Sequence, residues 1–184
     1  MSSKILMING SPNLNGYTMA CAEKIFEPFT YELLHAYRLN INPCDDCKVC
    51  HHVLRCKHKD AIESVIEKIK HSDTLILVSP VYFGAMTDQL LKIINRFQQL
   101  FEAKYTHKST PIKLKNLYVI STCAAPQDTM FDGIKLTTSI LKELFSVENV
   151  SIFTANNTDH ITNILSENKS SIEQFSQQVK KELE

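Results

Sequence analysis

The sequence predicts an α/β fold in which a doubly wound, five-stranded parallel sheet of order 2-1-3-4-5 carries helices on both faces. Short apolar runs alternate with amphipathic helical patterns along the whole chain, as in successive right-handed crossovers. The central runs are continuously apolar, which is typical of parallel strands buried on both faces. Three of the four glycines, at positions 10, 16 and 84, directly follow two of these runs. Ligands of such sheets bind beyond the carboxyl ends of the strands, where the strand order reverses.

The five strands are expected where apolar residues are continuous or alternate between turns. The first lies near residues 4–9, and the third is the run Thr74-Leu-Ile-Leu-Val78. Residues 31–39 alternate only loosely, so they predict a second strand at the periphery of the sheet. The fourth and fifth strands are expected at residues 117–121 and 150–154.

The helices are expected between these strands. The first covers about 17–28, and the second begins at Asp60 and repeats apolar residues at i, i+3, i+4 and i+7. A third carries an apolar stripe over 86–101, before a polar stretch at 102–115 that predicts a surface loop. A helix over about 131–146 and a long C-terminal helix complete the pattern.

Length and composition predict a single domain over residues 1–184 with a cysteine-rich insert at about 42–58. The 20 Lys and Arg residues balance the 20 Asp and Glu residues, so no basic face for nucleic acid is expected. No apolar run approaches the length of a membrane span or a signal peptide. We therefore expect a cytoplasmic protein with no nucleic-acid or membrane partner, whose six cysteines serve metal, cluster or redox chemistry rather than disulfides.

The segment after the first strand has the features of a phosphate-binding turn. It runs from Gly10 through Gly16 into the first helix, whose free amides and positive dipole end favour an anion. Neutral side chains can add hydrogen bonds there: Ser11, Asn13, Asn15, Tyr17 and Thr18. The turn lacks both the Gly-Lys-Ser/Thr of a P-loop and the G-x-G-x-x-G of a dinucleotide site, which favours a mononucleotide such as FMN.

The segment after the third strand, Pro80-Val81-Tyr82-Phe83-Gly84, suits a planar ring. A stiff backbone with free amides can bind ring carbonyls and nitrogens, and the aromatic pair offers a flat apolar wall to an isoalloxazine. The alternative interpretation is that these aromatic side chains only fill the packing between helices.

Together these motifs resemble the NAD(P)H-dependent FMN reductases of the flavodoxin-like fold, in the branch of the iron–sulfur flavoproteins and their cluster-free relatives. The resemblance covers about residues 4–155. It departs from the family pattern at Asn13, Tyr17 and Asn95, and the loop after the fourth strand lacks the usual glycines. It implies that the FMN phosphate binds Ser11, Asn13, Asn15, Gly16, Tyr17 and Thr18, and that the ring contacts Pro80, Val81, Tyr82, Phe83, Gly84, Thr122 and Cys123.

Four cysteines between positions 44 and 56 have the spacing C-x2-C-x2-C-x5-C. Compact runs of this kind bind [4Fe–4S] clusters, which makes Cys44, Cys47, Cys50 and Cys56 candidate metal ligands. A tetrahedral zinc site is an alternative, because histidines are also present in this segment. The third interpretation is a metal-free loop that shapes the substrate pocket or a dimer contact. The resemblance does not separate them, since the family includes members with a cluster and members that keep the cysteines without one.

These features predict a flavoenzyme that binds FMN and takes hydride from NADH or NADPH at flavin N5, so no catalytic side chain is assigned. The reduced flavin would pass electrons to free flavin, a quinone, an azo or nitro compound, or a cluster. One alternative is an electron-transfer protein of the flavodoxin or iron–sulfur flavoprotein type without direct NAD(P)H turnover; another is a non-catalytic module that senses metal or redox state. The resemblance also implies a homodimer or homotetramer, to which exposed Tyr82 and Phe83 would contribute.

Overall fold

The computed structural model describes residues 4–109 and 112–184, and these residues contain a five-stranded parallel sheet. The strand order is β2-β1-β3-β4-β5, as the sequence predicts, and every neighbouring pair is parallel. The order reverses between β1 and β3, which places the topological switch point at that pair. The strands are β1 (Ile5–Asn9), β2 (Glu32–His35), β3 (Thr74–Pro80), β4 (Asn116–Thr122) and β5 (Asn149–Ala155).

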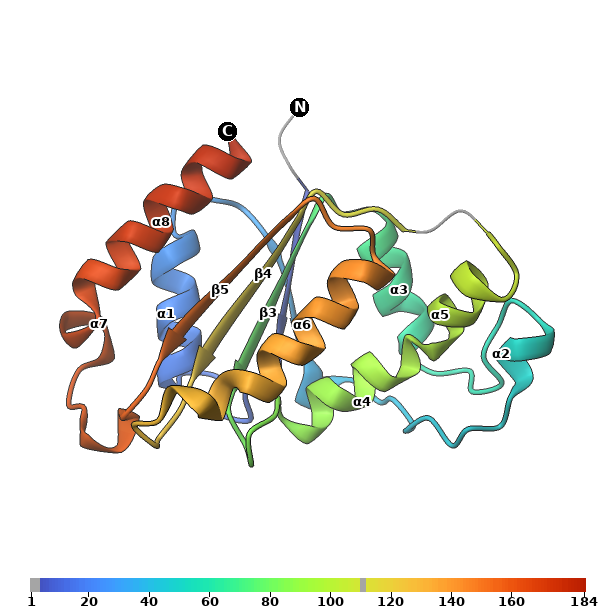
Figure 1. The fold of residues 1–184 in the computed structure, drawn as a ribbon, viewed down its shortest axis with the longest axis horizontal. Coiled ribbons are helices and arrows are strands. Elements are labelled where there is room, and N and C mark those ends of the chain that lie inside the picture. Colours follow the sequence, from blue (N-terminus) through green and yellow to red (C-terminus); the bar gives the residue numbers. More distant parts are fainter. Residues whose placement is uncertain (1–3, 110–111) are drawn as a thin grey trace.

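Helices cover both faces of the sheet (Figure 1). One face carries α1 (Tyr17–Phe26) and α8 (Lys169–Leu183). The other face carries α3 (Ile62–Lys70), α4 (Asp88–Arg96) and α6 (Asp132–Leu144). The remaining helical segments are α2 (Val49–His52), α5 (Gln98–Tyr105), α7 (Ile164–Glu167) and the 3-10 turns η1 (Ala36–Arg38), η2 (Asp128–Phe131) and η3 (Thr158–His160).

Each face of the sheet has its own hydrophobic core. Consecutive side chains of a strand point to opposite faces, so Leu6 and Ile8 of β1 join the core beneath α3, α4 and α6, whereas Met7 joins the core beneath α1 and α8. Both faces are therefore apolar, which explains why β1 and β3 are continuous apolar runs in the sequence.

The C-terminal helix α8 is held by an aromatic contact and a hydrogen bond. The ring of Phe175 lies edge-on to Phe153, with 5.7 Å between centroids. The hydroxyl of buried Tyr118 donates to Glu182 Oε2 at 2.6 Å. Burial, with Glu182 as the second cause, raises the pKa of Tyr118 far above its usual value. None of the helices in the described residues is long and apolar enough to cross a membrane.

Two predicted elements need correction. The second strand is shorter than residues 31–39, because His35 already pairs with Asn9, the last residue of β1, and the chain turns into η1. The third helix is interrupted at Phe97, which separates α4 from α5. The Phe97 ring stacks edge-on against Phe145 at 5.4 Å, so the break buries this ring. The predicted loop at 102–115 begins in α5, and residues 110 and 111 of it lie outside the described residues.

Candidate functional site

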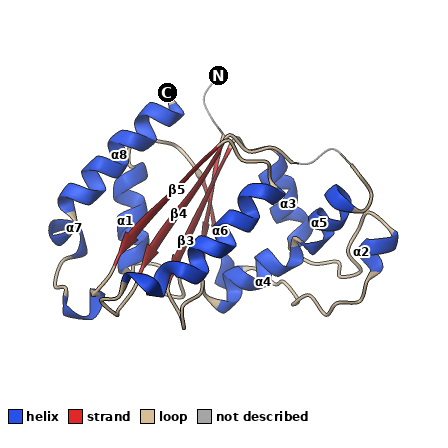
Figure 2. Ribbon diagram, in the orientation of Figure 1, coloured by secondary structure: helices blue, strands red, loops and turns tan. Residues whose placement is uncertain are grey.

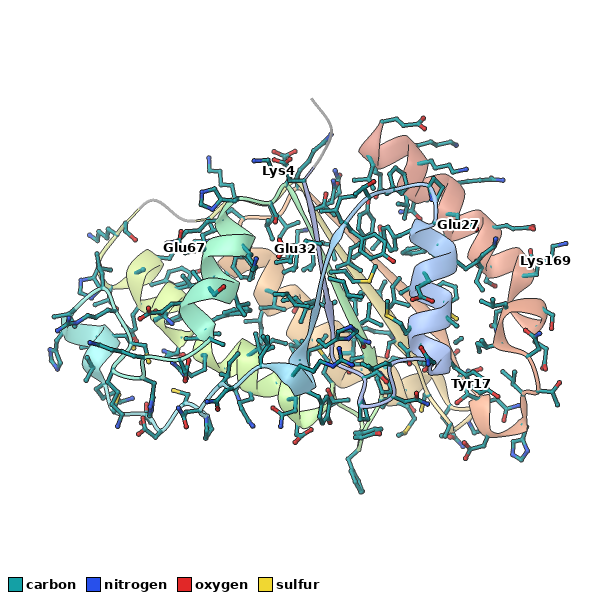
Figure 3. All side chains as sticks on the ribbon, turned by 180° about the vertical axis from the view of Figure 1, so that it is seen from behind. Lys4, Tyr17, Glu27, Glu32, Glu67 and Lys169 are labelled. Carbon is teal, nitrogen blue, oxygen red and sulfur yellow. The ribbon has the colours of Figure 1, made fainter. Side chains whose placement is uncertain are left out.

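The loops that follow the strands gather at the carboxyl edge of the sheet (Figure 2). Figure 3 shows Tyr17 at this end of α1, whereas Glu27 and Lys4 lie toward the opposite end. The structure thus places the two predicted FMN segments on adjacent loops, since β1 and β3 are hydrogen-bonded neighbours.

The loop after β1 is shaped largely by its own short side chains. Asn9 Oδ1 accepts a hydrogen bond from the Ser11 amide at 2.8 Å, and Ser11 Oγ donates to Asn13 O at 2.9 Å. Asn13 Oδ1 in turn accepts from the Asn15 amide at 3.1 Å. Ser11 and Asn13, predicted as phosphate contacts, therefore also stabilise the turn, in the manner of Asx and Ser turns. This preorganises the backbone that leads into α1.

The start of α1 joins this loop to the loop after β4. Gly16 is the N-cap of α1 and has no side chain that could accept a hydrogen bond from the helix. In the described residues no side chain caps the first-turn amides of α1. The hydroxyl groups of Thr18 and Thr122 lie 2.5 Å apart, and both residues are buried. Cys123, the next residue, is also buried. Thr18 and Thr122, two predicted site residues from distant parts of the chain, are thereby brought together.

The loop after β3 forms a tight hairpin turn. Tyr82 and Ala85 exchange both backbone hydrogen bonds, at 2.9 and 3.0 Å, and Phe83 and Gly84 between them have φ angles of 50° and 74°. Positive φ at both central residues is the geometry of a type I′ turn. A non-glycine residue in this region costs roughly 1–2 kcal/mol. The turn leaves Phe83 fully exposed and Tyr82 about half exposed, as the sequence predicts.

Thr87 and Gly133, to which the motifs assign no role, help to connect the hairpin to its surroundings. Thr87 Oγ1 donates to Gly10 O at 2.6 Å, and the Val81 amide donates to Thr122 O at 2.8 Å. Gly133, near the start of α6, approaches the hairpin so closely that a Cβ placed on it would lie 2.2 Å from Gly84 O. Gly133 is the fourth glycine of the chain, and its distance in sequence from the strand ends hid this contact.

Two further segments missed by the sequence analysis border the same edge. The Tyr17 hydroxyl donates to Ile161 O at 3.0 Å, which brings the loop after β5 beside the start of α1. On the other side, the Tyr37 hydroxyl donates to Asp88 Oδ1 at 2.6 Å, at the first residue of α4. Burial and the neighbouring Asp88 raise the pKa of Tyr37 to about 12, so Tyr37 stays a proton donor at neutral pH.

The four clustered cysteines line one pocket, at the outer end of α4 and away from the sheet. Its walls include Arg96 and Glu102 in addition to the thiols. The thiols are free, and no group of three or more His, Cys, Asp or Glu side chains in residues 4–109 and 112–184 stands close enough to hold a metal ion. The four thiols thus border the same pocket, but in the described residues they are not arranged as a closed coordination site.

Histidines and carboxylates surround this pocket. His51 Nδ1 lies 3.0 Å from Glu102 Oε2, and the His107 ring hydrogen-bonds Cys50 O at 3.2 Å. Burial, followed by the negative charge of Glu102, raises the pKa of the Cys50 thiol. The short helix α2, which contains Cys50, packs against α5 through these contacts.

The two candidate sites occupy the two ends of α4. Asp88 begins this helix beside the hairpin, and Arg96 ends it beside the cysteine pocket. Eight residue steps at 1.5 Å each separate them by about 12 Å along the helix axis. One rigid element therefore fixes the spacing between the sites.

Comparisons with known proteins agree with this geometry. A family model described as NADPH-dependent FMN reductase matches residues 3–132. The chain belongs to the NADPH-dependent FMN reductase family. Its fold is flavodoxin-like and similar to that of an NAD(P)H:quinone oxidoreductase from Methanothermobacter marburgensis, with a TM-score of 0.72 over 96% of this chain and 95% of that one, at 13% identity.

Two sequence relatives of this chain are named iron–sulfur flavoproteins. One, from Methanocaldococcus jannaschii, is 30% identical over 102 residues, which is 53% of each protein. The other, from Archaeoglobus fulgidus, is 34% identical over 100 residues, which is 50% of this chain and 48% of that protein. The chain spans about half the length of these curated relatives.

Replacing Gly133 with alanine tests the packing of α6 against the hairpin. Alanine normally stabilises a helix relative to glycine, but here its Cβ would collide with Gly84 O. Overpacking of this kind costs about 1–3 kcal/mol, so a G133A variant that must displace the hairpin should bind FMN roughly fivefold to 150-fold more weakly. Flavin fluorescence titration of the apoprotein measures the affinity.

The matched control is S139A, on the exposed side of the same helix. It should bind FMN as tightly as the unaltered chain. Equal affinity for G133A and S139A would contradict the role given to the close approach.

Proposed function

We propose that this chain is an FMN-dependent oxidoreductase that takes hydride from NAD(P)H and passes the electrons to a second acceptor in the same cleft. The observation that supports it most is that hydrogen bonds join the segments that follow β1, β3 and β4. These hydrogen bonds link Thr18 with Thr122, Thr87 with Gly10, and Val81 with Thr122. A preformed, mostly neutral cradle at a topological switch point suits a mononucleotide cofactor. FMN would supply the redox chemistry, accepting hydride at its N5 atom.

The chain's own residues would bind and orient this cofactor. The phosphate would meet the free amides at the start of α1 and the short polar side chains of the loop before it: Ser11, Asn13, Asn15, Gly16, Tyr17 and Thr18. The hairpin would provide amides and an apolar wall for the ring, from Pro80, Val81, Tyr82, Phe83 and Gly84. Thr122 and Cys123 would close the third side of the cleft. The close approach of Gly133 to the hairpin and the hydrogen bond from Thr87 to Gly10 would keep the hairpin in place while substrates exchange.

The acceptor is proposed as a small planar or conjugated molecule such as a flavin, a quinone or an azo or nitro compound. Exposed aromatic groups beside the cleft, Tyr82 and Phe83, can stack on such molecules. The zero net charge of the chain offers no strong electrostatic steering toward a charged protein partner. These features favour direct turnover over a dedicated shuttle of single electrons.

Turnover of NAD(P)H tests this proposal. Protein purified without oxygen should show flavin absorption bands, and adding NADH or NADPH with a quinone should oxidise the nucleotide faster than free FMN alone does. Heat-denatured protein with the same FMN serves as the control. Absence of bound flavin, together with turnover no faster than free FMN, would overturn the proposal; bound flavin without NAD(P)H oxidation would instead support electron transfer of the flavodoxin type.

We propose in addition that Cys44, Cys47, Cys50 and Cys56 bind a [4Fe–4S] cluster. The donor chemistry fits, because all four thiols border one pocket and thiolates are the ligands of such clusters. Two relatives bearing the name iron–sulfur flavoprotein support the same assignment. The cluster would be an additional electron acceptor within the protein, at the far end of α4 from the flavin.

Metal analysis of anaerobically purified protein tests the cluster. We expect about four irons per chain and a broad visible absorption. The variant C56S should lose both, whereas C21A, which alters a buried thiol of α1, should keep both. Zinc in place of iron, or no metal in the unaltered chain, would contradict the assignment, and turnover that stays intact in C56S would contradict the role of the cluster as an electron acceptor.

We further propose that the protein functions as a homodimer or homotetramer. Exposed apolar side chains of the hairpin and of α6 support it, since Phe83 is fully exposed and Leu136 and Ile140 of α6 are more than half exposed. Light scattering of the FMN-loaded protein should give twice or four times the chain mass, and F83S should lower it. A monomer with FMN bound would refute the proposal.

A further inference from the structure

Arg96 is a buried cation at the border of the cysteine pocket. Its side chain is only 1% exposed, and it ends α4 at the side of the pocket. Nη1 donates to Asn42 O at 2.7 Å and to Asp60 Oδ2 at 2.8 Å. Nη2 donates to Cys56 Sγ at 3.2 Å and to His58 O at 3.4 Å. Nε is buried without a hydrogen-bond partner among the described residues.

These partners come from both ends of the cysteine segment. Asn42 lies two residues before Cys44, whereas Cys56 and His58 lie at the other end of the segment. Asp60 strengthens the closure, because it also accepts hydrogen bonds from the Asn42 amide at 2.9 Å and the Ile62 amide at 3.1 Å. One planar guanidinium thus joins the beginning and the end of a loop that contains all four thiols. A lysine ammonium could not reach these directions at once.

The charges around the pocket make Arg96 distinct. Lys48 and Lys57 are exposed and pair with the exposed carboxylates Asp46 and Asp45, so solvent screens them. Glu102 contributes a carboxylate on the opposite wall. Arg96 is shielded from solvent, and its Nη2 faces a sulfur and a carbonyl rather than a carboxylate. Its charge therefore acts on Cys56 Sγ with little screening by solvent, although the buried carboxylate of Asp60 on Nη1 offsets part of it.

We propose that Arg96 is the positioning residue of the cysteine site, holding Cys56 in place as a ligand and raising the reduction potential of the cluster through its charged hydrogen bond to Sγ. This inference rests on the proposed cluster. Reduction adds one electron, donated by the reduced flavin, and therefore one unit of negative charge to the site. A cation donating to a ligand sulfur stabilises the reduced state more than the oxidised state.

The test compares R96K and R96Q with the control R55Q. Arg55 is exposed and adjacent to Cys56 in sequence, so R55Q removes the same charge without removing a hydrogen bond to sulfur. A hydrogen bond from a charged group accounts for about a tenfold effect. We expect R96Q to lower the ratio of reduced to oxidised cluster about tenfold at a fixed potential, which is a shift of about 59 mV for one electron.

The midpoint potential is measured by an anaerobic titration followed by electron paramagnetic resonance, with iron counted in each sample. The midpoint potential of R96K should lie between those of R96Q and the unaltered chain, because lysine keeps the positive charge but cannot make all the hydrogen bonds of the guanidinium. Loss of iron in R96K and R96Q but not in R55Q would also support the positioning role. FMN binding at the other end of α4 reports whether each variant is folded.

D60N provides a second measurement that does not remove Arg96. It keeps an acceptor for Nη1 but deletes the charge that partly neutralises the guanidinium, so the potential should rise. The inference is overturned if R96Q and D60N both keep the potential of the R55Q control while the cluster is present. An iron-free unaltered chain would overturn the proposed cluster, and this inference with it.

Discussion

The parallel pairing of β1 with β3 is the constraint on which the rest of the structure depends. The register joins Ile5 to Thr74 and Asn9 to Val78, and the Gly10 amide extends the pairing with a hydrogen bond of 2.7 Å to Val78 O. Beyond that point the two loops must separate, because α1 packs on one face of the sheet and α4 on the other. Thr87 links the two loops again by donating a hydrogen bond to Gly10 O, at the switch point where ligands of such sheets bind.

Helix α4 fixes the distance between the two candidate sites, because one lies at each of its ends. Its first residue, Asp88, follows the hairpin and receives the Tyr37 hydrogen bond, while its last residue, Arg96, closes the cysteine segment. The break at Phe97 then allows α5 to form the opposite wall of the cysteine pocket. Phe97 is buried in the core beneath α3, α4 and α6, so side-chain packing fixes the position of this break.

Contacts on several sides stabilise the strained backbone of the hairpin. Phe83 occupies a backbone conformation that side chains disfavour, and its ring gains no burial in return. The turn persists because Tyr82 and Ala85 exchange hydrogen bonds, Val81 bonds to Thr122, and α6 abuts Gly84 through Gly133. Strain that the surroundings impose is typical of ligand sites. The exposed Phe83 ring is then available to a cofactor, an acceptor or a second subunit.

The sequence by itself determined the order of the elements and of the strands in the sheet, since short apolar runs such as Thr74–Val78 that alternate with helical patterns are typical of buried parallel strands. It also determined which loops follow β1 and β3, and the spacing of the cysteines. The tertiary structure decided the contacts between distant residues: Thr18 with Thr122, Gly133 with Gly84, and Arg96 with both ends of the cysteine segment. It also decided the break at Phe97 and the early end of β2. Local periodicity specifies which face of an element is apolar, but these partners are set by how the helices pack across the sheet.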